Sequence, residues 1–400
     1  MKSSIEKLYE LSNKANRKIL GLMSGTSLDG LDIALCNIEG AGRKVKVTLL
    51  QFETLPYTDS FQKRIRNLIS NQNVSLQELT LMNPYIAQVH ADLVNQALKK
   101  WNLSTEDIDL IASHGQTIFH APKNFHHDND IANATLQLGD GDHIAALTGI
   151  TTISDFRQKH IAFGGEGAPL VCYGDFLLFR HATKNRILLN IGGIANITYL
   201  PANCEFNQVI ATDTGPGNGL MDDWMRKYFP GKKFDENGKI ASTGQVAQAL
   251  LAVMKKNPFF SLPLPKTTGA ETFNIDYLEN CIEKINLNNL NNNDVLATLN
   301  QLTCITIYET IQNIISDNPN CEIILSGGGL HNETLMRGLK QLLPAYTFLT
   351  TADLNINPDA KEAILFALLA NETLSGNEET FQGNVEHPLN VSLGKISLPF

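Results

Sequence analysis

Basic residues are scarce in this 400-residue sequence, which has 32 Lys and Arg against 41 Asp and Glu and a formal net charge of −9. Because an acidic surface repels polyanions on average, we expect no nucleic acid partner. Long apolar runs are also missing, since no stretch reaches the roughly eighteen apolar residues of a membrane span. The opening MKSSIEKLYELSNKANRK has no apolar block typical of a signal peptide. We therefore expect no membrane partner and no export.

Cysteine is sparse, and no two cysteines form a CxxC motif. The six are scattered along the chain: Cys36, Cys172, Cys204, Cys281, Cys304 and Cys321. In a chain of this length, such scatter favours buried thiols in a reducing compartment over a disulfide framework. We therefore expect a cytoplasmic location.

The apolar content, 43% of the residues, suffices for a sizeable core, and the length exceeds what one core usually serves. Strands are expected at 18–23, 31–38 and 45–52 and amphipathic helices at 59–70 and 84–101, which predicts an α/β layer. Another strand, glycine turn and strand follow at 186–201. Because this hairpin pattern occurs twice, we expect an internal duplication with a cleft between its halves.

These halves set the expected domains. An amino-terminal extension covers 1–17, domain I covers 18–185 plus 371–400, and domain II covers 186–370. The apolar helix expected around 359–370 is suited to lie between layers.

Glycine-rich turns follow apolar strands at several points. In GLMSGTSLDGLDIAL (21–35), an Asp-Gly step between apolar runs is typical of a tight hairpin. The amides and hydroxyls of such a loop also suit phosphate oxygens, and both interpretations can hold together. Similar turns at Gly192-Gly193 and Gly327–Gly329 lack GxGxxG and Walker A spacing. A nucleotide held by two halves needs donors from both, which favours binding turns over structural ones.

A fourth turn, DTGPGN (213–218), adds a carboxylate. Asp213 is expected to reach a hydrated cation, and the Gly215 and Gly217 amides are expected to reach a phosphate. The alternative is an Asx-type turn that leads into the next helix.

The segment ISDFRQKHIAFGGEGAPL (153–170) holds the candidate acid or base. Asp155 follows apolar residues, so its carboxylate is expected at a strand end, partly desolvated and able to take a proton. The alternative is a capping or salt-bridged aspartate with Arg157 as its partner.

Two further segments carry polar side chains of interest. In ASHGQT (112–117), His114 and Gln116 suit hydrogen bonds to sugar hydroxyls, and the alternative for His114 is a structural core histidine. The loop HHDND (126–130) has a metal-like composition but implies no third, distant ligand, so we expect no protein metal site there.

Taken in order, eight stretches resemble the anhydro-N-acetylmuramic acid kinase family: GLMSGTSLDGLD, SHGQT, GDGDHIAALTGI, SDFRQKHIAFGGEGAPLV, NIGGIANIT, DTGPGN, SGGGLHN and KEA. That family belongs to the superfamily of actin, sugar kinases and heat-shock chaperones. The resemblance therefore implies a two-domain, duplicated actin-like (ribonuclease H-like) ATPase fold with a central cleft. It makes 21–32 the first phosphate loop, 189–198 the second, and 325–332 the adenosine turn.

The resemblance also implies roles for individual residues. Asp155 is the expected catalytic base, and Glu362 helps to hold the reacting water; a lone helical Glu is otherwise a surface or capping residue. His114, Gln116 and Asp213 are expected to bind the substrate. The residues expected to contact ATP are Gly25, Thr26, Ser27, Leu28, Asp29, Gly30, Leu31, Asp32, Gly192, Gly193, Gly215, Gly217, Asn218, Gly327, Gly328, Gly329 and Asn332.

The implied activity is a double reaction on 1,6-anhydro-N-acetylmuramic acid in peptidoglycan recycling, with ATP and Mg²⁺. Water opens the internal bridge, and the freed 6-oxygen takes the γ-phosphoryl group. A homodimer is implied as well. The sequence departs from the family in its longer amino-terminal lead-in and in Ala270, where many members have a basic residue.

Other functions are weighed against this one. Another sugar kinase of the superfamily needs the same phosphate loops, but SHGQT, SDFR and GGEGAPL favour the anhydrosugar. An ATP-gated assembly or chaperone-like module hydrolyses ATP slowly without any sugar. A glycoside hydrolase uses paired carboxylates but leaves the glycine turns without a purpose.

Overall fold

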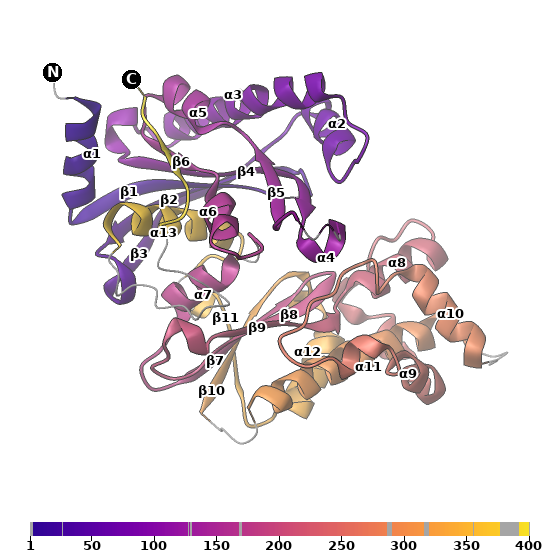
Figure 1. The fold of residues 1–400 in the computed structure, drawn as a ribbon. Coiled ribbons are helices and arrows are strands. Elements are labelled where there is room, and N and C mark those ends of the chain that lie inside the picture. Colours follow the sequence, from indigo (N-terminus) through magenta and orange to yellow (C-terminus); the bar gives the residue numbers. More distant parts are fainter. Residues whose placement is uncertain are drawn as a thin grey trace. The chain divides into compact units, whose positions relative to one another are not determined.

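The computed structural model describes residues 3–25, 27–126, 128, 130–167, 170–285, 290–315, 320–354, 356–376 and 392–399 (Figure 1). The chain forms two compact units. Unit 1 comprises Met1–Leu178, Glu205–Asn207 and Asp359–Phe400, and unit 2 comprises Phe179–Cys204 and Gln208–Pro358. No helix among the described residues combines the length and apolar character needed to cross a membrane.

Unit 1 is built on one sheet with the strand order β12-β6-β4-β1-β2-β3, and β5 also pairs with β4. Its strands are β1 (Asn16–Ser24), β2 (Gly30–Glu39), β3 (Lys46–Pro56), β4 (Leu110–Ala121), β5 (Ala134–Leu138), β6 (Thr152–Ser154) and β12 (Lys395–Ser397). Strands β1, β4 and β6 run parallel, whereas β2 and β3 are antiparallel to their neighbours.

Helices cover both faces of this sheet, with α3 and α5 on one face and α13 on the other (Figure 1). Burial from both sides explains why β1 and β2 are apolar along most of their length. The helices are α1 (Ser4–Asn13), α2 (Asp59–Leu68), α3 (Leu76–Lys100), α4 (Lys123–His126), α5 (Gly141–Thr148), α6 (Phe156–Ala162), α7 (Val171–Phe179) and α13 (Lys361–Ser375).

Helix α13 lies in unit 1, although the expected domain II extended to residue 370. The helix is apolar nearly all round and packs on β1, β2 and β4. The approach is so close that a Cβ at Gly21 would lie 1.8 Å from the Ala363 carbonyl oxygen. Tertiary packing therefore places this helix with the first sheet, despite its position after the last strand of the second.

The amino-terminal lead-in is anchored to unit 1. Ser3 and Glu6 form a capping box that starts α1. The buried Arg17 guanidinium donates hydrogen bonds to the Leu11 carbonyl at 2.8 Å and to Asn371 Oδ1 at 3.1 Å. Because these bonds join α1, β1 and α13, the lead-in is part of the folded unit.

Unit 2 has a five-stranded sheet with the order β11-β10-β7-β8-β9. Its strands are β7 (Asn185–Ile191), β8 (Ile194–Leu200), β9 (Ile210–Pro216), β10 (Cys321–Ser326) and β11 (Thr347–Thr350). Its α-helices are α8 (Gly219–Tyr228), α9 (Gln248–Met254), α10 (Ile275–Ile285), α11 (Asn292–Ile314) and α12 (Glu333–Leu342). Helix α11 packs on β8 and β9 and against α12.

The two sheets share one topology, which confirms the predicted duplication. In each, an antiparallel hairpin (β1–β2 or β7–β8) is flanked on one side by a third antiparallel strand, β3 or β9. On the other side lies a pair of strands parallel to the first strand, β4 and β6 or β10 and β11. This arrangement is the duplicated ribonuclease H-like, actin-like fold.

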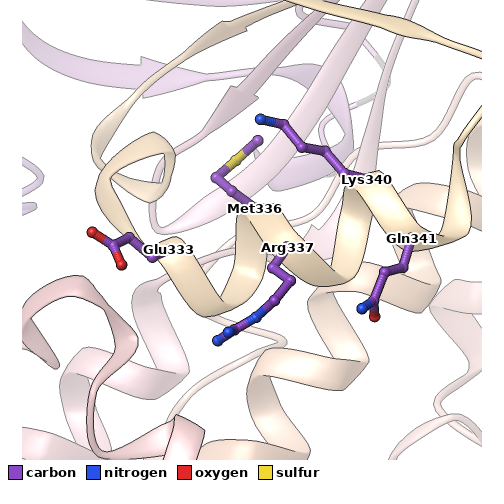
Figure 2. Close-up of a pocket in the computed structure, with 5 residues that line it drawn as sticks. All are labelled: Glu333, Met336, Arg337, Lys340 and Gln341. Carbon is purple, nitrogen blue, oxygen red and sulfur yellow. The ribbon is translucent and has the colours of Figure 1, made fainter.

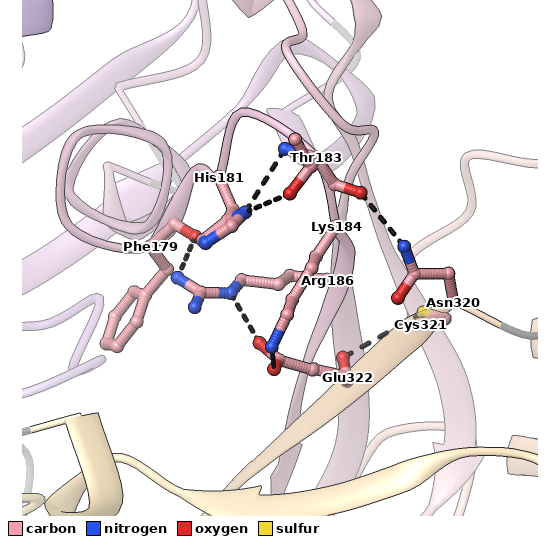
Figure 3. A network of polar contacts seen from close by, with 8 residues as sticks. All are labelled: Phe179, His181, Thr183, Lys184, Arg186, Asn320, Cys321 and Glu322. Carbon is pink, nitrogen blue, oxygen red and sulfur yellow. Dashed lines mark hydrogen bonds and ion pairs between the residues drawn. The ribbon is translucent and has the colours of Figure 1, made fainter.

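A buried ionic network fixes the amino ends of β7 and β10 in unit 2 (Figure 3). Glu322 accepts hydrogen bonds from Lys184 and, at 2.9 Å, from Arg186 Nε, and Arg186 Nη1 donates to the Phe179 carbonyl at 2.7 Å. Burial alone would raise the pKa of Glu322, but the two cations outweigh it, and the pKa is lowered. This network stabilises the sheet end opposite the glycine turns.

Candidate active site

Three segments with predicted site residues meet at one edge of the unit 1 sheet. Ser24 ends β1, Gln116 pairs with it on β4, and Asp155 directly follows β6. Because β1, β4 and β6 are parallel, their carboxyl ends lie at the same edge. Ligands of α/β sheets bind outside the carboxyl ends of the strands, so this edge is the candidate site of unit 1.

The first glycine turn connects β1 to β2, which confirms the predicted hairpin. Ser27 Oγ donates a hydrogen bond to Asp29 Oδ1 at 2.6 Å within the turn. A Cβ at Gly25 would have space, with its nearest atom 3.7 Å away. Thr26, expected to contact ATP, lies outside the described residues.

Apolar side chains hold this turn in the core. Leu28 has a left-handed φ of 59° and is buried, as is Leu31. A Cβ at Gly30 would lie 2.5 Å from the Leu55 carbonyl oxygen of β3. These three residues therefore shape the turn, and any contribution of theirs to ATP binding is through the backbone.

Asp32, just inside β2, carries an unusual carboxylate. It accepts a hydrogen bond from Thr54 Oγ1 at 2.5 Å. Burial raises its pKa, and the neighbouring Asp29 and Asp359 carboxylates raise it further against the effect of Thr54. Crowded carboxylates of this kind favour a nearby cation.

His114 is buried and neutral. Arg157 Nε and Nη2 lie 3.2 and 3.0 Å from His114 Nε2, and a guanidinium is always a donor, so Nε2 accepts. Burial, helped by the Arg157 charge, lowers the pKa of His114 to about 3. Gln116 is buried too, and its Oε1 accepts a hydrogen bond from Ser24 Oγ at 2.6 Å. Both side chains thus have protein partners, and their contact with substrate stays a prediction.

Asp155 stands at the first position before α6 in a left-handed conformation, with φ 55° and ψ 50°. Its side chain makes no capping hydrogen bond, and its Oδ2 pairs with Lys395 Nζ at 2.5 Å. The expected partner, Arg157, instead binds His114 and donates to the Gly167 carbonyl at 2.7 Å. The prediction of an Asp155–Arg157 ion pair was therefore wrong, because α6 turns Arg157 towards β4.

Glu362, in the first turn of α13, belongs to the same edge. Its side chain is exposed, yet the surrounding protein desolvates it enough to raise its pKa. Asp32 and Asp175 raise the pKa further, and Lys361 and Arg157 oppose them. Electrostatic coupling to both Asp32 and Arg157 places Glu362 near the candidate site.

In unit 2, two predicted turns pack directly on each other. The Gly217 and Gly219 amides donate to the Gly193 carbonyl at 2.9 and 3.0 Å, and the Asn218 amide donates to the Gly192 carbonyl at 2.7 Å. A Cβ at Gly217 would lie 2.3 Å from the Gly192 oxygen. The Gly217 and Asn218 amides therefore hold the turns together in this structure.

The third turn lies against the same end of β7. Gly327 has a φ of 82°, and a Cβ there would lie 2.7 Å from the Ile191 carbonyl oxygen. A Cβ at Gly329 would lie 2.3 Å from Ile191 Cγ2, and one at Gly328 would lie 3.7 Å from Asn218 Nδ2. The structure thus brings the three predicted turns of unit 2 together at the carboxyl ends of β7 and β10.

The remaining predicted residues of unit 2 have structural partners. Asp213 Oδ2 accepts a hydrogen bond from the Thr268 amide at 2.8 Å, and burial raises the pKa of Asp213. Gly215 has a φ of 135°, which favours glycine. Asn332 caps α12, since its Oδ1 accepts the Leu335 amide at 3.0 Å.

A hollow of about 440 Å³ lies along α12 (Figure 2). It is lined by Glu333, Met336, Arg337, Lys340 and Gln341, all from that helix. None of the predicted site residues lines it, so it carries none of the proposed chemistry. Within the described part of the chain, no group of three or more His, Cys, Asp or Glu side chains is arranged to hold a metal ion.

Sequence reasoning missed Lys395 and the true partners of Arg157. Lys395 lies 240 positions from Asp155, so no local motif joins them. Arg157 was visible in SDFR, but its orientation depends on α6.

Comparisons with known proteins agree on one family. A family model described as anhydro-N-acetylmuramic acid kinase matches residues 17–396. A protein of that name from Pseudoalteromonas atlantica is 48% identical over the full length of both chains. One from Caldanaerobacter subterraneus subsp. tengcongensis is 40% identical over 98% of this chain and 100% of its own. Among solved structures, the activator of 2-hydroxyisocaproyl-CoA dehydratase from Clostridium difficile with bound ADPNP matches with a TM-score of 0.40 and 13% identity, covering 89% of this chain and 95% of that one.

Proposed function

The chain belongs to the anhydro-N-acetylmuramic acid kinase family, and we propose that it converts 1,6-anhydro-N-acetylmuramic acid, water and ATP into N-acetylmuramic acid 6-phosphate and ADP. This reaction returns an internally bridged amino sugar of the cell wall to metabolism.

The observation that carries the proposal is the position of Asp155. It shares the carboxyl edge of the unit 1 sheet with the first glycine turn and with His114 and Gln116. Helix α6 does not use its carboxylate as a cap. Its ion partner, Lys395, is mostly exposed, and an exposed pair contributes little stability, so water and sugar displace the lysine at low cost.

In the proposed step, Asp155 takes a proton from water while the water oxygen bonds to the anomeric carbon. The bond between that carbon and the bridging oxygen breaks, and its electron pair stays on the 6-oxygen. This oxygen attacks the γ-phosphorus, and ADP leaves. Glu362 orients the water from the start of α13.

Arg157 is the proposed anchor for the carboxylate of the sugar acid. Among the described residues, no carboxylate forms an ion pair with it. Its Nε–H, one Nη2–H and one Nη1–H are used by His114 and Gly167, which leaves one N–H on each terminal nitrogen. Two such donors match the two oxygens of a carboxylate. His114 and Gly167 thus orient the guanidinium for the substrate.

ATP is proposed to contact backbone donors of both units, from the first turn and from the turns around Gly193 and Gly328. The carboxylates of Asp29 and Asp32 fit Mg²⁺, because their mutual repulsion is relieved by a cation. Mg²⁺, when bound with ATP, offsets the charge of the transferring phosphoryl group. Asp213 is proposed to bind substrate through its second carboxylate oxygen, since Oδ2 is held by Thr268.

We further propose a cytoplasmic homodimer. The cytoplasm supplies ATP and reduced thiols, and the buried cysteines suit that environment. Light scattering of the purified protein measures the mass directly, and a monomer at micromolar concentration would contradict the dimer.

A mass spectrum tests the reaction. The anhydrosugar is incubated with Mg-ATP and the protein, and the product is expected to gain one water and one phosphoryl group together. Omitting ATP serves as the control and is expected to leave the anhydrosugar unchanged. A gain of the phosphoryl group alone would indicate a different kinase mechanism, and sugar-independent ADP release would favour the assembly module.

A further inference from the structure

Four buried polar side chains form a chain of hydrogen bonds beneath the first glycine turn. Tyr57 Oη lies 2.9 Å from His90 Nε2 and donates to Ser24 Oγ at 2.8 Å, and Ser24 Oγ donates to Gln116 Oε1 at 2.6 Å. All four are at most 5% exposed. They come from four places in the sequence: the end of β1, the segment after β3, α3 and β4.

The direction of these bonds is fixed. The Ser24 hydroxyl gives its proton to Gln116, so it must accept from Tyr57. Tyr57 then has only lone pairs for His90, whose proton must be on Nε2. Because both lone-pair and proton positions of Ser24 are occupied by protein, its hydroxyl acts on the turn through position.

Tyr57 holds the first turn at both ends. Its hydroxyl binds Ser24, which directly precedes the turn, and its backbone amide donates to the Asp29 carbonyl, at the end of the turn, at 3.2 Å. Its ring also packs against Phe61, with ring centres 4.5 Å apart. One residue therefore sets the span between the two ends of the turn.

The same network holds an irregularity in β4. The register between β1 and β4 shifts between Leu22 and Ser24, so that Ser24 faces Gln116. Gly115 takes a φ of 71° there, and a Cβ on it would lie 2.6 Å from the Leu138 carbonyl oxygen. A bulge redirects neighbouring side chains, and the Ser24–Gln116 bond closes this one beside His114.

We propose that Tyr57, supported by His90, is a positioning residue that holds the first phosphate turn and the SHGQT strand in the arrangement needed for phosphoryl transfer. The inference rests on the proposed function, because it assigns these two segments to ATP and sugar. Neither Tyr57 nor His90 touches the reacting atoms.

Tyr57→Phe tests this, since it keeps the ring and the backbone bond and removes only the hydroxyl. We expect kcat/KM for ATP to fall about tenfold or more, because small displacements of reacting groups are costly. The affinity for a non-hydrolysable ATP analogue, measured by calorimetry, is expected to fall as well. The matched control is Tyr277→Phe, which removes a hydroxyl bond to the Met254 carbonyl (2.8 Å) in unit 2 and is expected to leave both quantities unchanged.

A second pair of variants removes the dependence on one substitution. His90→Gln can still donate to Tyr57 and is expected to retain most activity, whereas His90→Leu cannot and is expected to resemble Tyr57→Phe. If Tyr57→Phe and His90→Leu fold and keep wild-type kinetics and analogue affinity, the proposal is overturned. Failure of the wild-type protein to form the phosphorylated sugar would instead refute the proposed function, and the analogue affinities would still decide the role of Tyr57.

Discussion

Asp155 and Lys395 form an ion pair of 2.5 Å across the junction of β6 and β12. Lys395 reaches this position because it pairs with Ser154, the residue before Asp155, in the antiparallel ladder of the two strands. The carboxyl-terminal strand thus places an exposed cation beside the proposed base.

Asp155→Asn is expected to lower kcat by about 10²–10⁴-fold, the usual loss for a positioned base, with both KM values near wild type. Asparagine adopts the left-handed conformation of this position as readily as aspartate, so the fold is retained. Steady-state kinetics with both substrates measure the effect. Near-normal turnover would remove Asp155 from its proposed role.

Lys395→Met is the matched control, because it removes the partner and keeps the carboxylate. The exposed pair is worth less than about 1 kcal/mol, so the free energy of unfolding should barely change. Turnover is expected to persist. A loss as complete as that of Asp155→Asn would transfer the essential role to the lysine.

Arg157→Lys is expected to raise the KM for the sugar about tenfold, with little change in the KM for ATP. Lysine keeps the charge but lacks the planar pair of donors that matches a carboxylate. An anhydrosugar whose carboxylate is converted to an amide provides the control. If the wild type and the variant still differ by the same factor on that amide, Arg157 does not bind the carboxylate.

Two buried histidines predict how stability depends on pH. Burial lowers the pKa of His90 to about 4 and that of His114 to about 3, whereas histidine in an unfolded chain titrates near about 6.5. Between these values the unfolded chain binds protons that the folded protein does not. The free energy of unfolding should therefore fall as pH falls from about 6.5 towards 4, by up to about 1.4 kcal/mol per pH unit for each histidine.

Denaturant unfolding between pH 5 and 8 measures this slope. His90→Gln removes one of the two groups and should make the slope shallower. His143→Gln, at an exposed position on α5, should leave it as in the wild type. Identical slopes in all three proteins would show that His90 is not held neutral by the fold.

The duplication could be predicted because its signals are local. Each hairpin combines two apolar runs with a short turn of small residues, and both lie within about twenty residues of sequence. The second helix of unit 1 was predicted less well. It was expected to begin at Pro84, as proline is common in a first turn, but α3 begins at Leu76. Met82 and Ile86 are buried on either side of Pro84, so core packing outweighs the missing backbone bond.

The site was predicted as a set of segments but not as a set of contacts. Ser24, Gln116 and Asp155 stood in recognisable motifs, and their strand-end positions followed from the alternation of strands and helices. Tyr57 and Lys395 stood in no motif. They join the site only because β3 and β12 return to its edge, and sequence periodicity does not report which strands become neighbours.

Gly217→Ala is expected to destabilise unit 2, because its methyl group would meet the Gly192 carbonyl oxygen at 2.3 Å. Relieving that overlap separates two turns that are joined by backbone hydrogen bonds. A loss of about 1–3 kcal/mol in the free energy of unfolding is expected, as measured by denaturant titration.

Gly193→Ala separates a ligand-binding glycine from a structural one. A Cβ at Gly193 has its nearest atom, Gly219 Cα, at 4.0 Å, so the free energy of unfolding should match the wild type. If phosphate oxygens approach the Gly193 backbone, however, the methyl group occupies their space. A penalty of about 1.4 kcal/mol for that overlap raises the Kd of a non-hydrolysable ATP analogue about tenfold. An unchanged Kd in a protein of normal stability would mean that the phosphates bind elsewhere, since neither misfolding nor lost packing could then mask their contact.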